Sequence, residues 1–305
     1  MNLLITGALG HIGSYYLTHV HKIKNINKIY VIDKINEKIL NLINLKIRKK
    51  IHFFNQDLSK EKINISNKIN IDCLIHLASI TDAAASINNK KEVYRNNLNC
   101  FKNVLNFCKI RKVKLIHVSS TSVYGSRDFY IDESCKELRP QSPYAHVKIK
   151  EEKILKKTNN KFKFVTLRFG TIVGPSSGMR FHTAVNKFCM QAYTNTPLHV
   201  WKTALKQFRP YLSLKDSFKT FNFIIKNKIF DRGIYNVVSE NMTVNDIIKK
   251  INKHKKTSIN LVNEKIMNQL SYKVNSSKIR KQGLSLNSKI GKDIADTFKL
   301  LNKRI

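Results

Sequence analysis

The sequence has few cysteines, no long apolar run and few acidic residues, and each shortage excludes a class of protein. Five cysteines in 305 residues are an odd number without metal-like C-x-x-C spacing, so neither a disulfide framework nor a metal site is predicted. No apolar run approaches the length of a membrane span, and no basic segment followed by an apolar stretch indicates a signal peptide. We expect a cytoplasmic protein without membrane association, whose thiols are free or buried.

Acidic residues number 20 against 56 basic ones, which gives a net charge of +36. Such a charge by itself favours nucleic acid, an acidic membrane surface or an anionic substrate as partner. Here, however, Lys, Asn and Ile are abundant along the whole length. The basic runs 46–50 and 249–256 are also not interleaved with aromatic residues, as a surface for single-stranded nucleic acid would be. Nucleic-acid binding is therefore the less favoured interpretation.

A glycine-rich turn stands near the N-terminus, between a short buried-strand pattern at 3–5 and a segment with helical potential. Its spacing is G-x-x-G-x-x-G, with Gly7, Gly10 and Gly13. In this context Gly7 permits a tight turn, Gly10 lets backbone approach a pyrophosphate, and Gly13 lets helix and strand pack closely. Strand, glycine turn and helix in this order predict a dinucleotide site.

A second predicted strand, Lys28–Asp33, ends in an acidic residue downstream of the glycine turn. A carboxylate at this place binds the adenosine ribose and repels a 2′-phosphate, so Asp33 favours NAD over NADP. Lys34 leaves NADP open, because a basic side chain there is able to accept a 2′-phosphate. An ordinary strand-end role for Asp33 is the structural alternative.

Further strands are predicted at 51–54, 71–78 and 114–120, separated by helix-length polar segments. This rhythm predicts a parallel sheet with helices on both faces. Cofactors bind at the carboxyl ends of such strands, where the sequence has Asp57-Leu58, Leu77-Ala78-Ser79 and Ser119-Ser120. Helices are predicted at 97–109, from Thr243 and at 289–300, and a strand at 233–238. His76 and His117 lie within apolar strands, so we interpret both as buried, neutral and hydrogen-bonded.

The segment Ser142–Lys148 carries the candidate chemistry. If Pro143 opens a helix, Tyr144 and Lys148 stand four residues apart on one face. The ammonium then favours the phenolate and lowers the phenol pKa toward the range useful for proton transfer. A hydroxyl from the turn that begins Ser119-Ser120 is able to hydrogen-bond both Tyr144 and a substrate oxygen. Alone, the pair is more typical of a solvated helix face than of a catalytic site.

Taken together, these motifs resemble those of the extended short-chain dehydrogenases/reductases, in particular the NAD-dependent nucleotide-sugar epimerase/dehydratase group. The resemblance covers nearly the whole chain. The residues that carry it are Thr6, Gly7, Gly10, Gly13, Asp33, Asp57-Leu58, His76-Leu77-Ala78, Asn97, Asn103, Ser119-Ser120, Val123-Tyr124-Gly125, Ser142-Pro143-Tyr144, Lys148, Glu151, Leu167-Arg168-Phe169, Val173-Gly174-Pro175, Arg209-Pro210-Tyr211 and Asp216.

The resemblance implies an α/β fold, a Rossmann-type doubly wound parallel sheet with a smaller mixed α/β C-terminal substrate lobe. Residues 1–169 form the NAD-binding domain with the catalytic residues, and 170–305 form mainly the substrate lobe, with some segments returning to the first domain. Ser120, Tyr144 and Lys148 are the implied catalytic residues. The implied NAD-binding residues are Gly7, Gly10, His11, Ile12, Gly13, Asp33, Asp57, Leu58, Leu77, Ala78, Ser79, Asn97, Tyr144 and Lys148.

On the substrate side, Arg180 and Arg209 place positive charge where a diphosphate is expected, and guanidinium groups suit phosphate recognition. Thr121 and Thr171 are the further implied substrate contacts. Dehydratases of the group carry an Asp-Glu pair after the catalytic hydroxyl, whereas this chain has Thr121-Ser122, which argues against sugar dehydration.

The sequence is therefore expected to encode an NAD-dependent epimerase of a nucleotide-diphosphate sugar, acting through transient oxidation of a sugar carbinol. Two alternatives remain: an NAD(P)-dependent reductase or dehydrogenase of a nucleotide sugar or other alcohol, and an RNA-binding, non-catalytic member of the same fold. A homodimer is expected, formed through a helix bundle that includes the helices of Asn97 and Tyr144.

Overall fold

A computed structural model describes residues 1–34, 39, 42, 45, 50–82, 89–263 and 271–302, so residues 46–49 of the first basic run lie outside the described residues. The strands are β1 Asn2–Thr6, β2 Lys28–Asp33, β3 Ile51–Asn55, β4 Cys73–His76, β5 Lys114–Ser120, β6 Tyr130–Ile131, β7 Phe164–Phe169, β8 Thr171–Val173, β9 Leu198–Trp201, β10 Phe208–Ser213, β11 Ile234–Val237, β12 Glu240–Thr243, β13 Ile259–Val262 and β14 Lys273–Val274. The α-helices are α1 His11–His19, α2 Lys90–Arg111, α3 Pro143–Lys156, α4 Ala184–Tyr193, α5 Leu214–Lys226, α6 Val244–Asn252, α7 Ser277–Lys281 and α8 Ile290–Leu301.

Seven strands form one parallel sheet in the order β11-β7-β5-β4-β1-β2-β3. The order reverses between β1 and β4, because the chain runs outward from β1 to β3 and then returns to place β4 on the other side of β1. Ligands of doubly wound sheets bind at such a reversal, beyond the carboxyl ends of the strands. The predicted Rossmann-type sheet is confirmed.

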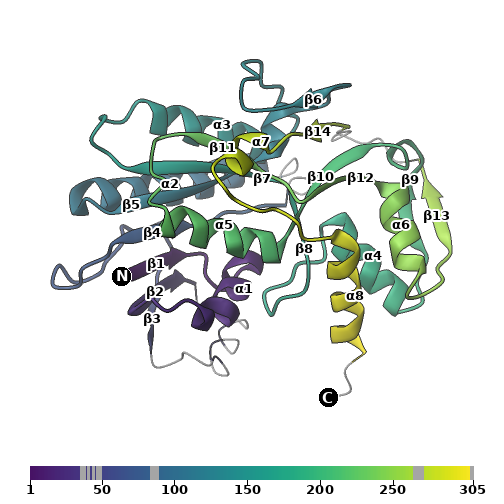
Figure 1. Ribbon diagram of the computed structural model, residues 1–305, viewed down its shortest axis with the longest axis horizontal. Helices are drawn as coiled ribbons and strands as arrows, with labels where there is room; N and C mark the ends of the chain where they lie inside the picture. The colour runs from purple at the N-terminus through teal and green to yellow at the C-terminus, as the bar shows by residue number, and fades with distance from the viewer. Residues whose placement is uncertain are drawn as a thin grey trace.

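Helices cover both faces of this sheet (Figure 1). On one face, Tyr16 and Leu17 of α1 share a core with Phe221 of α5. On the other face, Phe101 of α2 and Leu155 of α3 share a second core. Strands buried on both faces explain why the sequence shows continuous apolar runs rather than alternation.

The C-terminal part adds a smaller lobe, on the right in Figure 1. It contains a three-stranded sheet, β12-β10-β8, and a two-stranded sheet, β13-β9. Helices α4, α6 and α8 pack on these strands around one apolar core that includes Phe188, Ile248 and Ile294. Strand β11, although late in the chain, belongs to the seven-stranded sheet.

Several local predictions are confirmed. Strands at 28–33 and 114–120 have the predicted bounds, and α6 begins with a capping box made by Thr243 and Asp246. The strand predicted at 71–78 ends earlier, at His76, because the chain then crosses the glycine turn. The helix predicted at 97–109 is longer and ends where Lys112 adopts a left-handed conformation, with φ of 53°.

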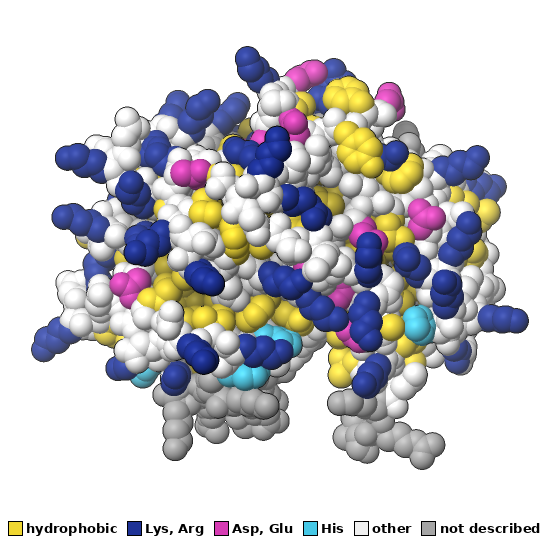
Figure 2. All heavy atoms as spheres, viewed as in Figure 1, with side chains coloured by type: hydrophobic (Ala, Val, Ile, Leu, Met, Phe, Trp, Pro, Cys, Tyr) yellow, Lys and Arg dark blue, Asp and Glu magenta, His cyan; other side chains and the backbone are white. Residues whose placement is uncertain are grey.

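Basic side chains spread over the whole visible face in Figure 2 and do not gather in one stripe. All five cysteines are free thiols, and Cys135 is the most accessible of them. Among the described helices, none is sufficiently long and apolar to cross a lipid bilayer.

Candidate active site

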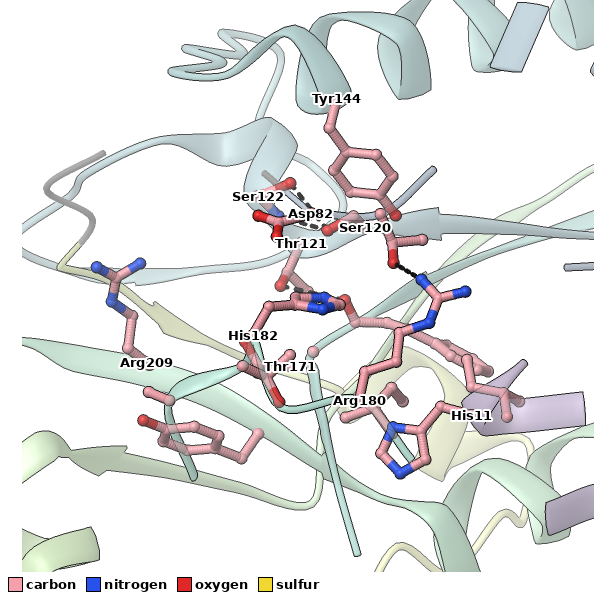
Figure 3. Close-up of a pocket in the computed structure, with 18 of the residues that line it drawn as sticks. His11, Asp82, Ser120, Thr121, Ser122, Tyr144, Thr171, Arg180, His182 and Arg209 are labelled. Carbon is pink, nitrogen blue, oxygen red and sulfur yellow. Dashed lines mark hydrogen bonds between the residues drawn. The ribbon is translucent and has the colours of Figure 1, made fainter. Parts of the chain in front are cut away.

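A pocket of about 680 Å³ lies between the carboxyl edge of the large sheet and the lobe (Figure 3). Both parts of the chain contribute side chains to its wall. The predicted site residues that line it are Gly7, Gly10, His11, Ile12, Gly13, Leu77, Ser79, Ser120, Thr121, Tyr144, Lys148, Thr171, Arg180 and Arg209.

The glycine turn has the geometry of a phosphate cradle. Gly7 has φ of 68°, and a Cβ atom there would lie 2.5 Å from the Ala78 nitrogen. A Cβ atom on Gly13 would lie 2.5 Å from the Ala8 carbonyl oxygen. Gly10 caps α1 without any side-chain hydrogen bond, so backbone N–H groups of the first helical turn remain available to an anion. These residues fit the pyrophosphate of a dinucleotide.

Asp33 braces this turn from the end of β2. The Leu9 N–H donates to its Oδ2 atom (2.8 Å), and the Lys34 N–H donates to Oδ1. Burial raises the pKa of Asp33, while these hydrogen bonds and the charge of Arg180 oppose the rise. The Lys34 ammonium lies 3.5 Å from Asp57 Oδ2, so its charge is directed to that carboxylate. This arrangement fits an adenosine ribose without a 2′-phosphate.

Five predicted cofactor residues do not line the pocket: Asp33, Asp57, Leu58, Ala78 and Asn97. Ala78 packs directly on Gly7. Asn97 is fully buried, and its amide exchanges two hydrogen bonds with the backbone of Ile80 (2.8 and 3.0 Å). In this structure Asn97 therefore shapes the loop after β4 rather than reaching the cofactor cradle.

Tyr144 stands at the start of α3, where Pro143 occupies the first turn and Ser142 accepts a hydrogen bond from the Ala145 N–H. Burial raises the pKa of the Tyr144 phenol, although Lys148, Arg180 and a hydrogen bond with Ser120 act in the opposite direction. The expectation that Lys148 lowers this pKa is correct for its own contribution. However, desolvation by burial outweighs this contribution and raises the pKa of Tyr144 overall.

Lys148 is almost fully enclosed, with 3% of its side chain exposed, and its Nζ atom lies 2.8 Å from Glu151 Oε2. Burial alone disfavours the ammonium, but the Glu151 carboxylate overrides it and raises the pKa of Lys148. An ammonium has three N–H donors, so the bond to Glu151 leaves two for a ribose and for the region of Tyr144.

The hydroxyl groups after β5 point in different directions. Ser120 Oγ accepts from the Ser122 N–H and lies 2.9 Å from Ser122 Oγ, at the wall of the pocket. Thr121 Oγ1 donates to the Phe169 carbonyl and lies 3.2 Å from Tyr272 Oη. The Ser120 hydroxyl therefore lies on the side of Tyr144. Thr121 instead connects the end of β5 to Phe169 and Tyr272 of the same chain.

The two predicted arginines lie at different ends of the pocket (Figure 3). Arg180 donates to Thr81, and its Nη2 atom would lie 3.5 Å from a Cβ atom on Gly10, so it covers the glycine turn. Arg209, on β10, lies beside Tyr211 and Tyr272, and burial lowers its pKa. Both predicted arginines therefore line the same pocket, at different places along its wall.

The sequence analysis assigned no site role to several lining residues, and apart from Tyr211 they stand outside the motifs that carry the resemblance. Most come from the lobe, where periodicity indicates core or surface but not a pocket. Figure 3 shows Asp82 and His182 between the two arginines. The main missed residues are Thr81, Asp82, His182, Lys187, Phe188, His199, Trp201, Tyr211 and Tyr272.

Comparison with known families identifies the family to which the chain belongs. The profile described as the NAD dependent epimerase/dehydratase family matches residues 3–237, which covers the seven strands of the large sheet and the segment with Tyr144 and Lys148. The chain belongs to this family. It is therefore an enzyme whose cofactor is NAD, in agreement with the fit of the glycine turn and Asp33.

The chain is also similar to individual proteins whose names refer to nucleotide-sugar enzymes. A Bacillus subtilis protein named as an uncharacterized UDP-glucose epimerase is 28% identical over 236 residues, which are 74% of this chain and 72% of that protein. A trifunctional dehydratase, epimerase and reductase of UDP-sugars from Arabidopsis thaliana is 26% identical over 92% of this chain, which spans only 44% of the plant enzyme. The fold is similar to that of Bacillus cereus UDP-glucuronic acid 4-epimerase, with a TM-score of 0.86, 24% identity and 99% coverage of both chains.

Proposed function

We propose that this member of the family is an epimerase that acts on a nucleotide-diphosphate sugar through transient oxidation of a sugar carbinol. The observation that carries the proposal is the convergence of Ser120, Tyr144 and Lys148 on one wall of a pocket that also contains the glycine turn. A non-catalytic RNA binder has no need of an enclosed ammonium beside a phenol. The absence of an Asp-Glu pair after Ser120 favours epimerisation over dehydration.

When bound along Gly7–Gly13 and Asp33, NAD supplies the hydride acceptor and, later, the hydride donor. Tyr144 Oη is the atom that takes the carbinol proton and returns it. Lys148 supports the phenolate by its charge and orients a ribose through its free N–H groups. The Ser120 hydroxyl holds the sugar oxygen in line with Tyr144. Because burial raises the pKa of Tyr144, these positive and donor groups are required for proton transfer near neutral pH.

The lobe, residues 170–305, serves mainly to bind the substrate. Arg209, Tyr211 and Tyr272 form the end of the pocket far from the glycine turn, where a guanidinium near two tyrosines suits a nucleoside diphosphate. Arg180 covers the cofactor side and reaches toward the sugar from there. The nucleotide-sugar names of the relatives support this class of substrate. A homodimer through α2 and α3, which pack side by side, completes the proposal.

Replacement of Tyr144 with Phe tests the mechanism. We expect Tyr144→Phe to lower kcat on the cognate nucleotide sugar by about a thousandfold or more, because proton transfer loses its acid/base, while the protein still retains NAD. Epimerase activity is read as interconversion of the two sugars without net NADH formation. Tyr124→Phe is the matched control, since its phenol donates to Asn236 and stands outside the pocket lining. Undiminished turnover by Tyr144→Phe would exclude the mechanism, and net NADH formation would identify a dehydrogenase instead.

A further inference from the structure

Behind Lys148 lies a second, fully enclosed carboxylate that the reaction scheme above does not use. Glu151 is 1% exposed and stands one helical turn beyond Lys148 on α3. Its Oε2 atom accepts from Lys148 Nζ (2.8 Å) and also lies 2.9 Å from His117 Nε2 on β5. The Lys148 ammonium, which lines the pocket, therefore has the Glu151 carboxylate as its counter-ion, and Glu151 itself lies outside the pocket lining.

His117 holds this carboxylate in place. An ionised carboxylate only accepts hydrogen bonds, so His117 Nε2 carries the proton and donates to Glu151. The other ring nitrogen, Nδ1, lies 3.4 Å from Thr166 Oγ1 on β7. Two strands of the sheet thus fix the ring, and the ring fixes Glu151. Although burial opposes its ionisation, Lys148 and His117 hold the pKa of Glu151 at about 2.

The charged and titratable groups around Glu151 come from every element packed against it. On α3 these are Lys148, Tyr144 and the adjacent Glu152, and on β5 it is His117. His76 of β4 and Cys100 of α2 also face the pair, and burial keeps both neutral at ordinary pH by lowering the pKa of His76 to about 3 and raising that of Cys100 to about 12. Glu151 is therefore the carboxylate that directly balances Lys148.

The neighbouring Glu152 gives an internal comparison. It is also buried, but it pairs with Arg168 through both oxygens (3.0 and 2.6 Å) and accepts from Ser119 Oγ. These contacts join α3 to β7 and β5 and make no hydrogen bond to Lys148. The two adjacent acids of α3 thus have different partners. Glu152 binds groups that hold the helix on the sheet, whereas Glu151 binds Lys148 beside Tyr144.

We propose that Glu151, held by His117, is a positioning residue for the reaction: its carboxylate keeps the Lys148 ammonium charged and oriented and so sets the pH range in which Tyr144 exchanges its proton. This inference rests on the proposed roles of Tyr144 and Lys148. Glu151 touches neither substrate nor cofactor and acts through the lysine.

The negative charge of Glu151 determines in which direction its removal moves the pKa values of Lys148 and Tyr144. The negative Glu151 raises the pKa of Lys148 and also that of Tyr144. Removal of this charge lowers both values. In a bell-shaped profile of kcat, the acidic limb then reports Tyr144 and the alkaline limb reports Lys148. Both limbs are therefore expected to move to lower pH together.

The experiment compares the pH profile of kcat for the wild type, Glu151→Gln and Glu152→Gln. We expect Glu151→Gln to move both limbs down by about one to two pH units. Glu152→Gln, which removes another buried acid from the same helix, is expected to reduce stability with little displacement of either limb. A Glu151→Gln profile that keeps its position or moves upward overturns the proposal. An equal displacement in Glu152→Gln does so as well.

A second readout does not depend on turnover. In protein freed of NAD, the ¹³C chemical shift of the Tyr144 phenol carbon is titrated with pH, with Tyr144→Phe used for assignment. Glu151→Gln is expected to titrate at lower pH than the wild type, and coincident titrations overturn the inference. If no nucleotide sugar is converted by the wild type, the proposed function fails while this titration still decides the role of Glu151.

Glu151→Gln leaves a buried ammonium without its partner and is able to prevent folding. In that case Lys148→Met/Glu151→Gln gives the answer, because it removes both charges together. Recovery of folded protein in the double variant supports direct pairing of the two ions. A double variant as unstable as the single one means that Glu151 serves the fold through another contact, and the proposal is then wrong.

Discussion

Two buried carboxylates, Glu151 in the sheet half and Asp293 in the lobe, have opposite surroundings. In the sheet half, Glu151 has an ammonium at 2.8 Å and a histidine at 2.9 Å, and its pKa is held at about 2 against the effect of burial. In the lobe, Asp293 of α8 has its nearest ammonium, that of Lys215, at 4.0 Å. Its Oδ2 atom has no hydrogen-bond partner among the described residues, and burial raises its pKa to about 7.

Both carboxylates are 1% exposed, so the degree of burial does not explain the difference. What differs is the distance and number of donors around each one. In the half that carries the proposed proton transfer, Glu151 stays ionised over a wide pH range. The lobe contains an acid that changes its protonation close to neutral pH. Three predictions test this contrast, two through stability and one through binding.

The largest expected effect concerns the two lysines. Lys148→Met leaves Glu151 enclosed without its cation, so we expect a loss of about 3 to 5 kcal/mol in the free energy of unfolding. Lys215→Met removes a side chain that is 39% exposed, and we expect a change below about 1 kcal/mol. Urea unfolding of both variants measures the difference. Equal losses would show that the two carboxylates do not differ in their dependence on a cation.

The second prediction concerns Asp293 and the pH dependence of stability. Its pKa is higher in the folded chain than in the unfolded one, so the folded protein keeps a proton that the unfolded chain has lost. Stability from this group is complete below about pH 4 and is lost as the pH rises toward about 7. Asp293→Asn abolishes this titration.

Relative to the wild type, Asp293→Asn is therefore expected to gain on the order of 2 kcal/mol between about pH 5 and pH 8. Thermal and urea unfolding at both pH values give the measurement. Asp296→Asn is the control, because this acid is partly exposed and lies 2.6 Å from Lys215. If the wild type and Asp293→Asn lose stability in parallel, the lobe does not contain the proposed acid.

The smallest expected effect concerns ligand binding, because the two halves are proposed to bind different ligands. Arg209→Met removes a guanidinium from the lobe side of the pocket, and we expect KM for the nucleotide sugar to rise about tenfold, with NAD content unchanged. Arg139→Met, which replaces an exposed arginine paired with Glu137, serves as control. Loss of NAD rather than substrate affinity in Arg209→Met would contradict the division of the pocket into a cofactor side and a substrate side.

Much of the cofactor side was predictable from the sequence because its signals are local. The tight turn after β1 requires a positive φ at one position, which Gly7 supplies. Ser142 and Pro143 begin the helix that sets the spacing of Tyr144 and Lys148. Strand patterns of β-branched residues gave the sheet, and the capping box at Thr243 gave the start of α6. Each of these features depends on residues within a few positions of one another, whose physical preferences are independent of the rest of the chain.

Other features depend on contacts between distant segments. Thr121 meets Tyr272, which lies 151 positions away, and His117 meets Glu151, which lies 34 positions away. The direction of Arg180, toward the glycine turn rather than toward Arg209, follows from the path of the segment that hydrogen-bonds Ser14. No periodicity encodes such pairings, because they arise only when packing brings the elements together.

The sequence by itself thus determined the glycine turn, the parallel sheet and the spacing of the phenol and the ammonium, since backbone conformation and helical geometry are set locally. Only the tertiary structure decided which charges face one another. It placed Glu151 beside Lys148, put Asn97 outside the pocket lining and left the ammonium of Lys215, at 4.0 Å, as the cation paired with Asp293 among the described residues. Burial and distance control the strength of these electrostatic contacts, and both are properties of the folded chain alone.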